Sequence, residues 1–246
     1  MSIAKDDRIA YVIRGGRPIE GRLTPGGNKN AALPMLAATL LSEGPVVLAN
    51  LPAIRDVGVM LESLADLGAS VNEKAPGTWS IAGADLSKTE VPAGLASEIR
   101  ASFLLAGPLL ARFGQAVLPR PGGDRIGRRP LDTHLHAFEA LGAEIDIAPD
   151  NYRLRAPSGL QGTDIFLHEM SVMATENAVM AASLAVGSTT IRNAASEPHV
   201  QELCAFLNQL GGKINNIGSN TLQIEGVPRL GGGEFNIGPD YLEVVS

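Results

Sequence analysis

The sequence predicts an α/β (α+β) domain built from three β-α-β-α-β-β repeats, with the helices inside and the sheets outside. Two observations lead to this prediction. Similar strings recur about seventy residues apart, at 67–71, 141–145 and 210–214, and such self-similarity indicates a repeated structural unit. Each repeat also contains a segment of small apolar residues, and a helix that is apolar all round must be buried on every side.

The three strings mark the points where an amphipathic helix ends and a strand begins. Before the first string, apolar residues recur at helical spacing at Val59, Leu61 and Leu64, which is the pattern of a helix with one buried face. The glycine in second place of each string suits the left-handed conformation that ends many helices. Short alternating segments such as 79–81 and 221–224 follow, and they predict strands.

In each repeat, a second helix precedes these elements and a β-branched strand follows it. The predicted helices span 31–41, 102–111 and 177–185, and the strands after them span 45–48, 115–118 and 189–192. None of the three helical segments contains a charged residue, so each is predicted to have no solvent face. Three unrelated segments with chance similarity are the alternative, which the constant order of elements disfavours.

The two ends of the chain do not fit the repeats, which we place at residues 22–234. Residues 11–14 predict a strand before the first repeat, and residues 238–246 begin a new element that stops with the chain. A chain that ends inside an apolar segment looks like part of a longer protein.

Composition excludes several classes of function. The chain has 246 residues, 45% hydrophobic and 4% aromatic, and its formal net charge is −6. An acidic chain without a long Lys/Arg run is a poor partner for nucleic acid. No apolar run is long enough for a membrane span or a signal sequence, so we expect a cytoplasmic protein with no membrane partner. The single cysteine, Cys204, lies in a helical apolar pattern and is predicted to be a core thiol.

Two segments favour a small anionic ligand. Segment 26–34 is a glycine-rich turn leading into the first buried helix, where Lys29 and the free N–H groups of the helix end are close together. A capped helix whose lysine reaches solvent explains the same residues, so both interpretations stay open. Segment 119–134 is an insertion rich in glycine and arginine, typical of a mobile lid. Its glycine-rich half holds one carboxyl group, Asp124, for which a surface ion pair with Arg125 is the alternative role.

Two further positions are weaker pointers. Segment 168–177 starts the third buried helix, and Ser171 and Thr175 have plain structural roles there as cap and backbone partner. Arg100 opens the buried helix of the second repeat, where a cation opposes the helix dipole unless an anion is nearby. That local conflict points to a site.

Together these segments resemble the enolpyruvyl transferase family, and within it the enzymes that act on UDP-N-acetylglucosamine. The motifs that carry the resemblance lie at 27–34, 100–102, 121–124, 126–134, 171–177, 225–227 and 230–232. The family has two domains, each an inside-out α/β barrel (α/β prism) of three such repeats, which agrees with the repeat count. The resemblance implies that residues 1–21 form a strand of a second domain, absent from this chain, and that residues 235–246 start the crossover to it.

The resemblance implies a transfer of the enolpyruvyl group of phosphoenolpyruvate to the 3-hydroxyl of UDP-N-acetylglucosamine, with release of phosphate. This is the first committed step of peptidoglycan synthesis, and it implies no metal or organic cofactor. The implied contacts to phosphoenolpyruvate or its phosphate are Lys29, Asn30, Arg100 and Arg129. The implied contacts to UDP-N-acetylglucosamine are Arg129, Pro130, Leu131, Asp132, His134, Ser171, Val172 and Met173. Because the family's catalytic base lies in the second domain, we expect the chain without that half to be inactive.

Three positions depart from the family pattern. Asp124 stands where many members carry the cysteine that protonates phosphoenolpyruvate, so the resemblance implies that Asp124 is the general acid. A carboxyl group in that role needs a raised pKa, which desolvation on loop closure would supply. Since fosfomycin alkylates the cysteine, a carboxylate implies insensitivity to this drug. Met173 replaces a glycine, and Glu169 replaces a lysine of some members, which affects the nucleotide contacts.

Three alternatives remain beside a half-enzyme. They are a non-catalytic UDP-sugar binding module, a 5-enolpyruvylshikimate-3-phosphate synthase and a degenerate remnant. The synthase opens with a serine-rich version of the Lys29 segment and lacks the arginine-rich loop. Retention of the polar residues Lys29, Arg100, Asp124, Arg129 and Asp132 disfavours a remnant, because a core does not need them. Binding without turnover would distinguish the binding module.

Overall fold

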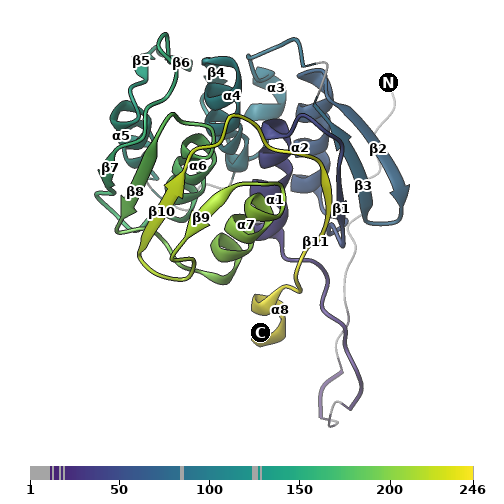
Figure 1. Cartoon of the computed structure of the whole chain (residues 1–246). Helices are drawn as coiled ribbons and strands as arrows, with labels where there is room; N and C mark the ends of the chain where they lie inside the picture. The colour runs from purple at the N-terminus through teal and green to yellow at the C-terminus, as the bar shows by residue number, and fades with distance from the viewer. Residues whose placement is uncertain are drawn as a thin grey trace, which may run out of the picture.

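Three sheets surround a core of helices in the computed structural model (Figure 1). The structure describes residues 12, 14–16, 18, 20–83, 86–123, 127 and 129–245. Of the strand predicted at 11–14, Tyr11 and Ile13 lie outside the described residues, and Val12 and Arg14 are not in a strand.

The elements follow one another in three similar sets. The first set is α1 (Lys29–Ala38), the 3₁₀ helix η1 (Thr39–Leu41), β1 (Val46–Ala49), α2 (Arg55–Asp66), β2 (Ser70–Ala75) and β3 (Thr78–Ala82). The second is α3 (Ala93–Ala96), the 3₁₀ helix η2 (Arg100–Leu105), α4 (Ala106–Phe113), β4 (Gln115–Pro119), α5 (Asp132–Ala140), β5 (Glu144–Ile147) and β6 (Asn151–Arg155). The third is β7 (Asp164–Phe166), α6 (Val172–Ala182), β8 (Ser188–Arg192), α7 (Pro198–Gln209), β9 (Lys213–Asn215) and β10 (Thr221–Glu225). The chain ends with β11 (Gly233–Asn236) and α8 (Tyr241–Val245).

The helices predicted to be apolar all round form the centre of the molecule. Eight consecutive residues of α1, from Ala31 to Ala38, are buried, and so are the nine from Ala174 to Ala182 in α6. The η2–α4 segment is buried from Ala101 to Leu110. A helix enclosed on every side has no polar face to present, so the inside-out arrangement predicted from the sequence is confirmed.

The glycines of the three repeated strings end their helices in the same way. Gly68, Gly142 and Gly211 have positive φ angles of 107°, 93° and 103°. In each case the N–H of the next residue donates to the carbonyl five residues earlier, at 2.9–3.0 Å. This bond satisfies a carbonyl that the helix end would otherwise leave free.

β11 was not predicted from the sequence, and it completes the first sheet in the order β11-β1-β3-β2. β11 runs parallel to β1, as β7 runs parallel to β8 at the equivalent edge of the third sheet. Two asparagines repeat the likeness, because Asn50 and Asn193 have φ near 60° and donate to the carbonyls of Ile237 and Leu167. In the second sheet, β4-β6-β5, a parallel bridge between Glu90 and Val117 takes this place.

In the sheet of the first repeat, β11 therefore takes the edge position that β7 takes in the sheet of the third repeat. Ile237, just after β11, is fully buried, so this segment is packed into the first repeat. The boundary that we place between residues 234 and 235 falls inside β11, and the division of the chain into domain and crossover stays a prediction.

Two smaller predictions concern burial and membranes. Cys204 lies on α7 with none of its surface exposed, as predicted, and burial followed by the charge of Glu176 raises the pKa of its thiol to about 12. Among the described residues, no helix has both the length and the apolar character to cross a bilayer.

Candidate active site

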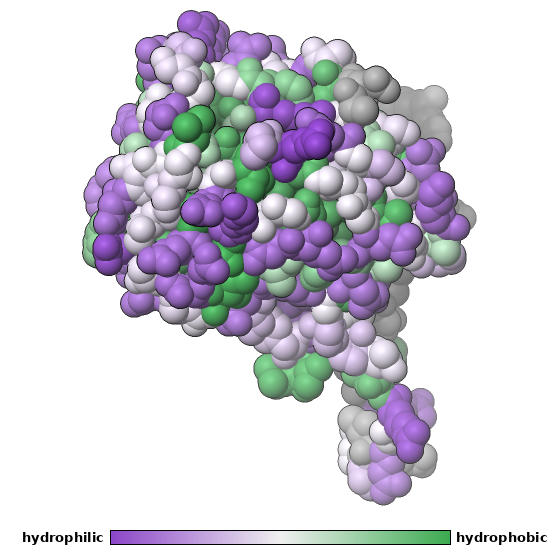
Figure 2. All heavy atoms as spheres, in the orientation of Figure 1, coloured by the Kyte–Doolittle hydropathy of each residue, from purple (hydrophilic) through white to green (hydrophobic). Residues whose placement is uncertain are grey.

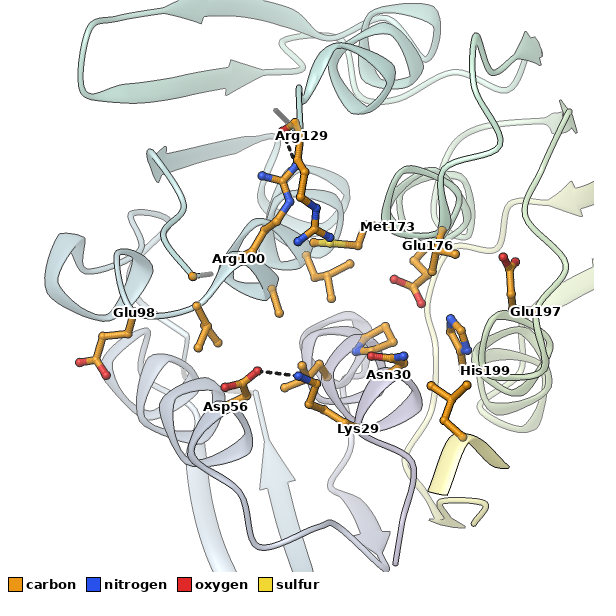
Figure 3. Close-up of a pocket in the computed structure, with 18 of the residues that line it drawn as sticks. Lys29, Asn30, Asp56, Glu98, Arg100, Arg129, Met173, Glu176, Glu197 and His199 are labelled. Atoms are coloured by element: carbon orange, nitrogen blue, oxygen red, sulfur yellow. Dashed lines mark hydrogen bonds and ion pairs between the residues drawn. The ribbon is translucent and has the colours of Figure 1, made fainter. Parts of the chain in front are cut away.

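The N-terminal ends of three inner elements, α1, η2 and α6, meet at one cleft of about 510 Å³ (Figure 3). The cleft is lined by Lys29, Asn30, Leu33, Pro34, Asp56, Glu98, Ile99, Arg100, Ala101, Leu104, Gly123, Arg129, Val172, Met173, Glu176, Glu197, His199, Tyr241 and Leu242. A helix N-terminus carries partial positive charge and free N–H groups. Convergent helix starts with added lysine and arginine therefore make a place for anions.

Asn28 fixes Lys29 at the start of α1. The Asn28 side chain accepts a hydrogen bond from the N–H of Ala31 at 3.0 Å, which is the usual N-cap contact. The ammonium of Lys29 lies 3.2 Å from a carboxylate oxygen of Asp56, and both side chains are partly exposed. The helix is thus capped and its lysine lines the cleft, whereas binding of an anion by Lys29 stays a prediction. Asp56, at the start of α2, is a neighbour that the sequence analysis missed.

Arg100 ties the end of the arginine-rich loop to the start of η2. Its Nη2 donates to the carbonyl oxygens of Arg129 at 2.6 Å and Pro130 at 3.4 Å. Its Nε is buried and has no partner among the described residues. Burial, and then the charge of Arg129, lower the pKa of the guanidinium. An anion beside Arg100 would relieve both effects, as the conflict with the helix dipole predicts.

The beginning of the same loop packs against the same segment. The N–H of Gly122 donates to the carbonyl of Ala96 at 3.0 Å. A Cβ at Gly122 would lie 1.6 Å from the carbonyl oxygen of Ser97, so only glycine fits this approach. Asp124, the predicted general acid, lies outside the described residues.

The residues predicted to hold the nucleotide divide into exposed and buried groups. Arg129, Pro130 and Asp132 are exposed, whereas Leu131 is 6% and His134 only 3% exposed. Of these five residues, only Arg129 lines the cleft. The contacts of all five residues with a ligand stay predictions.

His134 belongs to a buried hydrogen-bond network. Its Nδ1 lies 3.0 Å from the side-chain nitrogen of Asn177, which also donates to the carbonyl of Phe103. Burial, followed by the charge of Arg100, lowers the pKa of His134 to about 3. The ring is therefore neutral and its Nδ1 accepts from the amide, which leaves its proton on Nε2.

The start of α6 has the structural roles that the sequence suggested. Ser171 accepts from the N–H of Ala174 at 3.4 Å as the N-cap, and the hydroxyl of Thr175 donates to the carbonyl of Ser171 at 2.8 Å. Val172 and Met173 line the cleft, whereas Ser171 does not. The predicted nucleotide contacts of these three residues stay untested by this geometry.

The side of the cleft opposite Arg100 and Arg129 is acidic, and it was not predicted from the sequence. We call Glu176 and Glu197 the acidic wall. Glu176 is only 2% exposed, and its side chain points into the cleft opposite Arg100 and Arg129 (Figure 3). Burial and then the charge of Glu197 raise the pKa of Glu176 well above the usual value. The available signal was a glutamate directly before the apolar segment 177–185, because α6 begins at Val172 and so includes Glu176, and charged residues are seldom fully buried without a partner.

His199 and Tyr241 extend the acidic wall. Nδ1 of His199 lies 2.9 Å from the hydroxyl of Tyr241, which belongs to α8. Burial lowers the pKa of His199, although the charges of Glu197 and Asp240 oppose the shift. The chain's last helix thus contributes to the cleft.

The fold and this cleft define an enolpyruvyl transferase domain, and the comparison with known families agrees. The model of the EPSP synthase (3-phosphoshikimate 1-carboxyvinyltransferase) family matches residues 13–245. The chain therefore belongs to this family, and the resemblance inferred from its motifs is confirmed.

Relatives within the family are more specific. Proteins of Treponema denticola, Bradyrhizobium diazoefficiens and Borreliella burgdorferi, each named UDP-N-acetylglucosamine 1-carboxyvinyltransferase, are 54%, 50% and 47% identical to 96–97% of the chain. The chain covers 55% of the length of each. It thus spans about half the length of the curated relatives that it matches.

Solved structures support the fold. The enolpyruvyl transferase NikO from Streptomyces tendae matches 95% of the chain with a TM-score of 0.81 at 24% identity, and 55% of that structure is covered. EPSP synthase from Acinetobacter baumannii matches 89% of the chain with a TM-score of 0.70 at 20% identity, and 50% of that structure is covered. At these identities the likeness concerns the fold alone.

Proposed function

We propose that this chain supplies one half of a UDP-N-acetylglucosamine 1-carboxyvinyltransferase. The whole enzyme would transfer the enolpyruvyl group of phosphoenolpyruvate to the 3-hydroxyl of UDP-N-acetylglucosamine and release phosphate, in the cytoplasm and for peptidoglycan synthesis. The observation that carries the proposal is the cleft where three helix starts meet Lys29, Arg100 and Arg129. The names of relatives that are about 50% identical support this choice of substrates.

The cations account for binding of phosphoenolpyruvate. Lys29 and Arg129 would hold its phosphate, and the unpartnered Nε of Arg100 would take a further oxygen. Charge-assisted hydrogen bonds of this kind are stronger than neutral ones. Asn30, which also lines the cleft, would orient the sugar or the carboxylate at the entrance.

The nucleotide would lie between two segments at the edge of the cleft, residues 129–134 and residues 171–173. Arg129, Pro130, Leu131, Asp132 and His134 would form one wall, and Ser171, Val172 and Met173 the other. The N-terminus of α6 then faces the diphosphate, where its free N–H groups and dipole favour negative charge. His134 is buried, so its part would be to support this wall from below.

The reaction would be an addition followed by an elimination. The 3-oxygen of the sugar forms a bond to carbon 2 of phosphoenolpyruvate, while Asp124 gives a proton to the methylene carbon. In the elimination, the resulting methyl carbon returns a proton to the carboxylate of Asp124, the bond from carbon 2 to the phosphate oxygen breaks, and phosphate leaves. A base from the other half of the protein would take the proton of the 3-hydroxyl.

The face around α8 supports docking of that other half. Val244 and Val245 are 62% and 81% exposed, and the helix forms an apolar projection below the body of the domain (Figure 2). Exposed apolar side chains next to an active-site cleft are typical of a surface that another domain covers.

The first test is phosphate release from UDP-N-acetylglucosamine and phosphoenolpyruvate, by the chain alone and mixed with a separately produced second half. We expect release only in the mixture, and Lys29→Ala in this chain should abolish most of it. Release by the chain alone would show that the catalytic base is misplaced. No release in either case, with UDP-N-acetylglucosamine still bound, would favour a binding module instead.

A further inference from the structure

The acidic wall is an unusual feature in a cleft built for anions. Glu176 lies one turn inside α6 and is 98% buried, and its Oε1 has no hydrogen-bond partner among the described residues. The Oε2 of Glu197 is also buried, and it too has no hydrogen-bond partner in the part of the chain that the structure describes. Both carboxyl groups line the same space as Lys29, Arg100 and Arg129.

The groups around Glu176 decide its charge. The charged or titratable groups on elements packed against α6, or lining its cleft, are Glu197, His199, Glu202 and Cys204 at α7, Arg100 at η2, Asp132, His134, His136 and Glu139 on α5, Arg112 on α4, Arg192 on β8, Glu225 on β10, and Lys29, Asp56, Glu98, Arg129 and Tyr241 around the cleft. Cys204 and His134 are neutral at neutral pH. Arg112 donates to backbone carbonyls, and Arg192 and Glu225 pair with Asp164 and Lys213 at the surface.

The charge that acts on Glu176 is that of Glu197, and it has the wrong sign for an ionised Glu176. An unpaired buried carboxylate is costly, and a second carboxylate beside it adds repulsion. The neutral acid avoids both costs, and unlike the carboxylate it has an O–H to donate. An ionised Glu176 would also repel any anion held by the three cations across the cleft.

We propose that Glu176 is held as a neutral carboxylic acid and donates its O–H to an oxygen of the anion bound by Lys29, Arg100 and Arg129. Glu197 is the positioning residue, because its negative charge keeps the proton on Glu176. The inference rests on the anion site of the proposed function and adds a ligand-binding group to it. The cleft then binds one anion from two sides, with cations on one side and a neutral donor on the other.

The test uses inorganic sulfate as the probe, because sulfate keeps the same charge across neutral pH whereas phosphate does not. Its affinity is measured by calorimetry at a series of pH values for the wild-type chain and for Glu176→Gln. The wild-type affinity should fall by up to about tenfold per pH unit once Glu176 loses its proton. Glu176→Gln keeps a donor that cannot ionise, so its affinity should lack this fall.

Three further variants sharpen the comparison. Glu176→Leu has no donor and should bind sulfate more weakly than Glu176→Gln at every pH. Glu197→Gln should move the loss of affinity to lower pH, because the charge that retains the proton is gone. Glu98→Gln is the matched control, since Glu98 lines the same cleft but pairs with Arg55 at 2.7 Å, and it should keep the wild-type profile.

Infrared spectroscopy provides a readout that needs no ligand. The wild-type chain should show the carbonyl band of a protonated carboxylic acid at neutral pH, and Glu176→Gln should lack it. A missing band, or the same pH profile of sulfate affinity in wild type and Glu176→Gln, would overturn the inference alone. No sulfate binding to either protein would overturn the anion site itself, and with it the proposed function.

Discussion

At the scale of single residues, the cleft combines polar groups that have a partner with buried polar groups that have none among the described residues. Lys29 has a partner in Asp56, and among the described residues Arg100 donates hydrogen bonds only to backbone carbonyls. Glu176 has no partner for one of its oxygens among the described residues. Buried polar groups without a partner, such as Nε of Arg100 and Oε1 of Glu176, gain the most from a ligand, because ligand binding removes an existing cost.

Asp56 should compete with an anion for Lys29. Asp56→Asn removes the competing carboxylate, so sulfate should bind a few-fold more tightly in a calorimetric titration. The free energy of unfolding should change by less than about 1 kcal/mol, because the pair is partly exposed. Asp66→Asn is the matched control, since Asp66 forms a similar pair with Lys88 at 3.1 Å on the same helix and does not line the cleft. Equal affinities in the two variants would rule out the competition.

Asp124 should be needed for turnover in the two-half protein. A missing general acid typically lowers turnover by about 10²- to 10⁴-fold, and we expect Asp124→Ala to show this in a phosphate-release assay. Asp124→Cys should restore turnover and make the enzyme sensitive to fosfomycin. Full activity of Asp124→Ala would exclude the general-acid role.

At the scale of elements, α1, η2 and α6 each place a charged or titratable side chain in the same cleft, namely Lys29, Arg100 and Glu176. Each of these three elements starts the inner helical segment of its own repeat, and the three starts line the same cleft. The segment from residue 96 to residue 100 has an additional task, since it holds Gly122 at one end of the loop and Arg129 at the other.

Gly122→Ala should therefore loosen this attachment. Its added Cβ would overlap the carbonyl of Ser97 at 1.6 Å, so the backbone must shift. We expect a loss of about 1–3 kcal/mol in the free energy of unfolding, measured by urea denaturation. Gly94→Ala is the control, because nothing lies within 4 Å of its Cβ position and its stability should change little. A neutral Gly122→Ala would mean that this contact does not hold the loop.

At the scale of the whole molecule, the acidic wall links stability to pH. The pKa of Glu176 is raised on folding, from an ordinary value of 4.5, by burial and by Glu197. Between pH 4.5 and the higher pKa of the folded state, the folded chain holds a proton that the unfolded chain has released. The free energy of unfolding therefore falls as the pH rises through this range. Urea denaturation should show this fall in wild type and a smaller one in Glu176→Gln. Parallel curves for the two proteins would contradict a raised pKa.

Much of the fold was predictable because its causes are local in sequence. A helical segment without charged residues is stable only in the core, because it has no face for solvent. A glycine at a helix end marks where the helix stops and a strand follows, as at Gly68. Lys29, Arg100 and Arg129 were identifiable from their motifs. His134 was identified in the same way, but its burial against Asn177 and Phe103 was not visible in any pattern.

The sequence by itself determined the three repeats, the buried helices and their ends, and it identified the lysine and arginines that line the cleft, since each depends on residues a few positions apart. Only the tertiary structure decided that β11 completes the first sheet, that Asp56 pairs with Lys29, and that Glu176 and Glu197 line the same cleft. These contacts join residues 20 to almost 200 positions apart. Their energies depend on burial and on distance in space, which no short window of sequence contains.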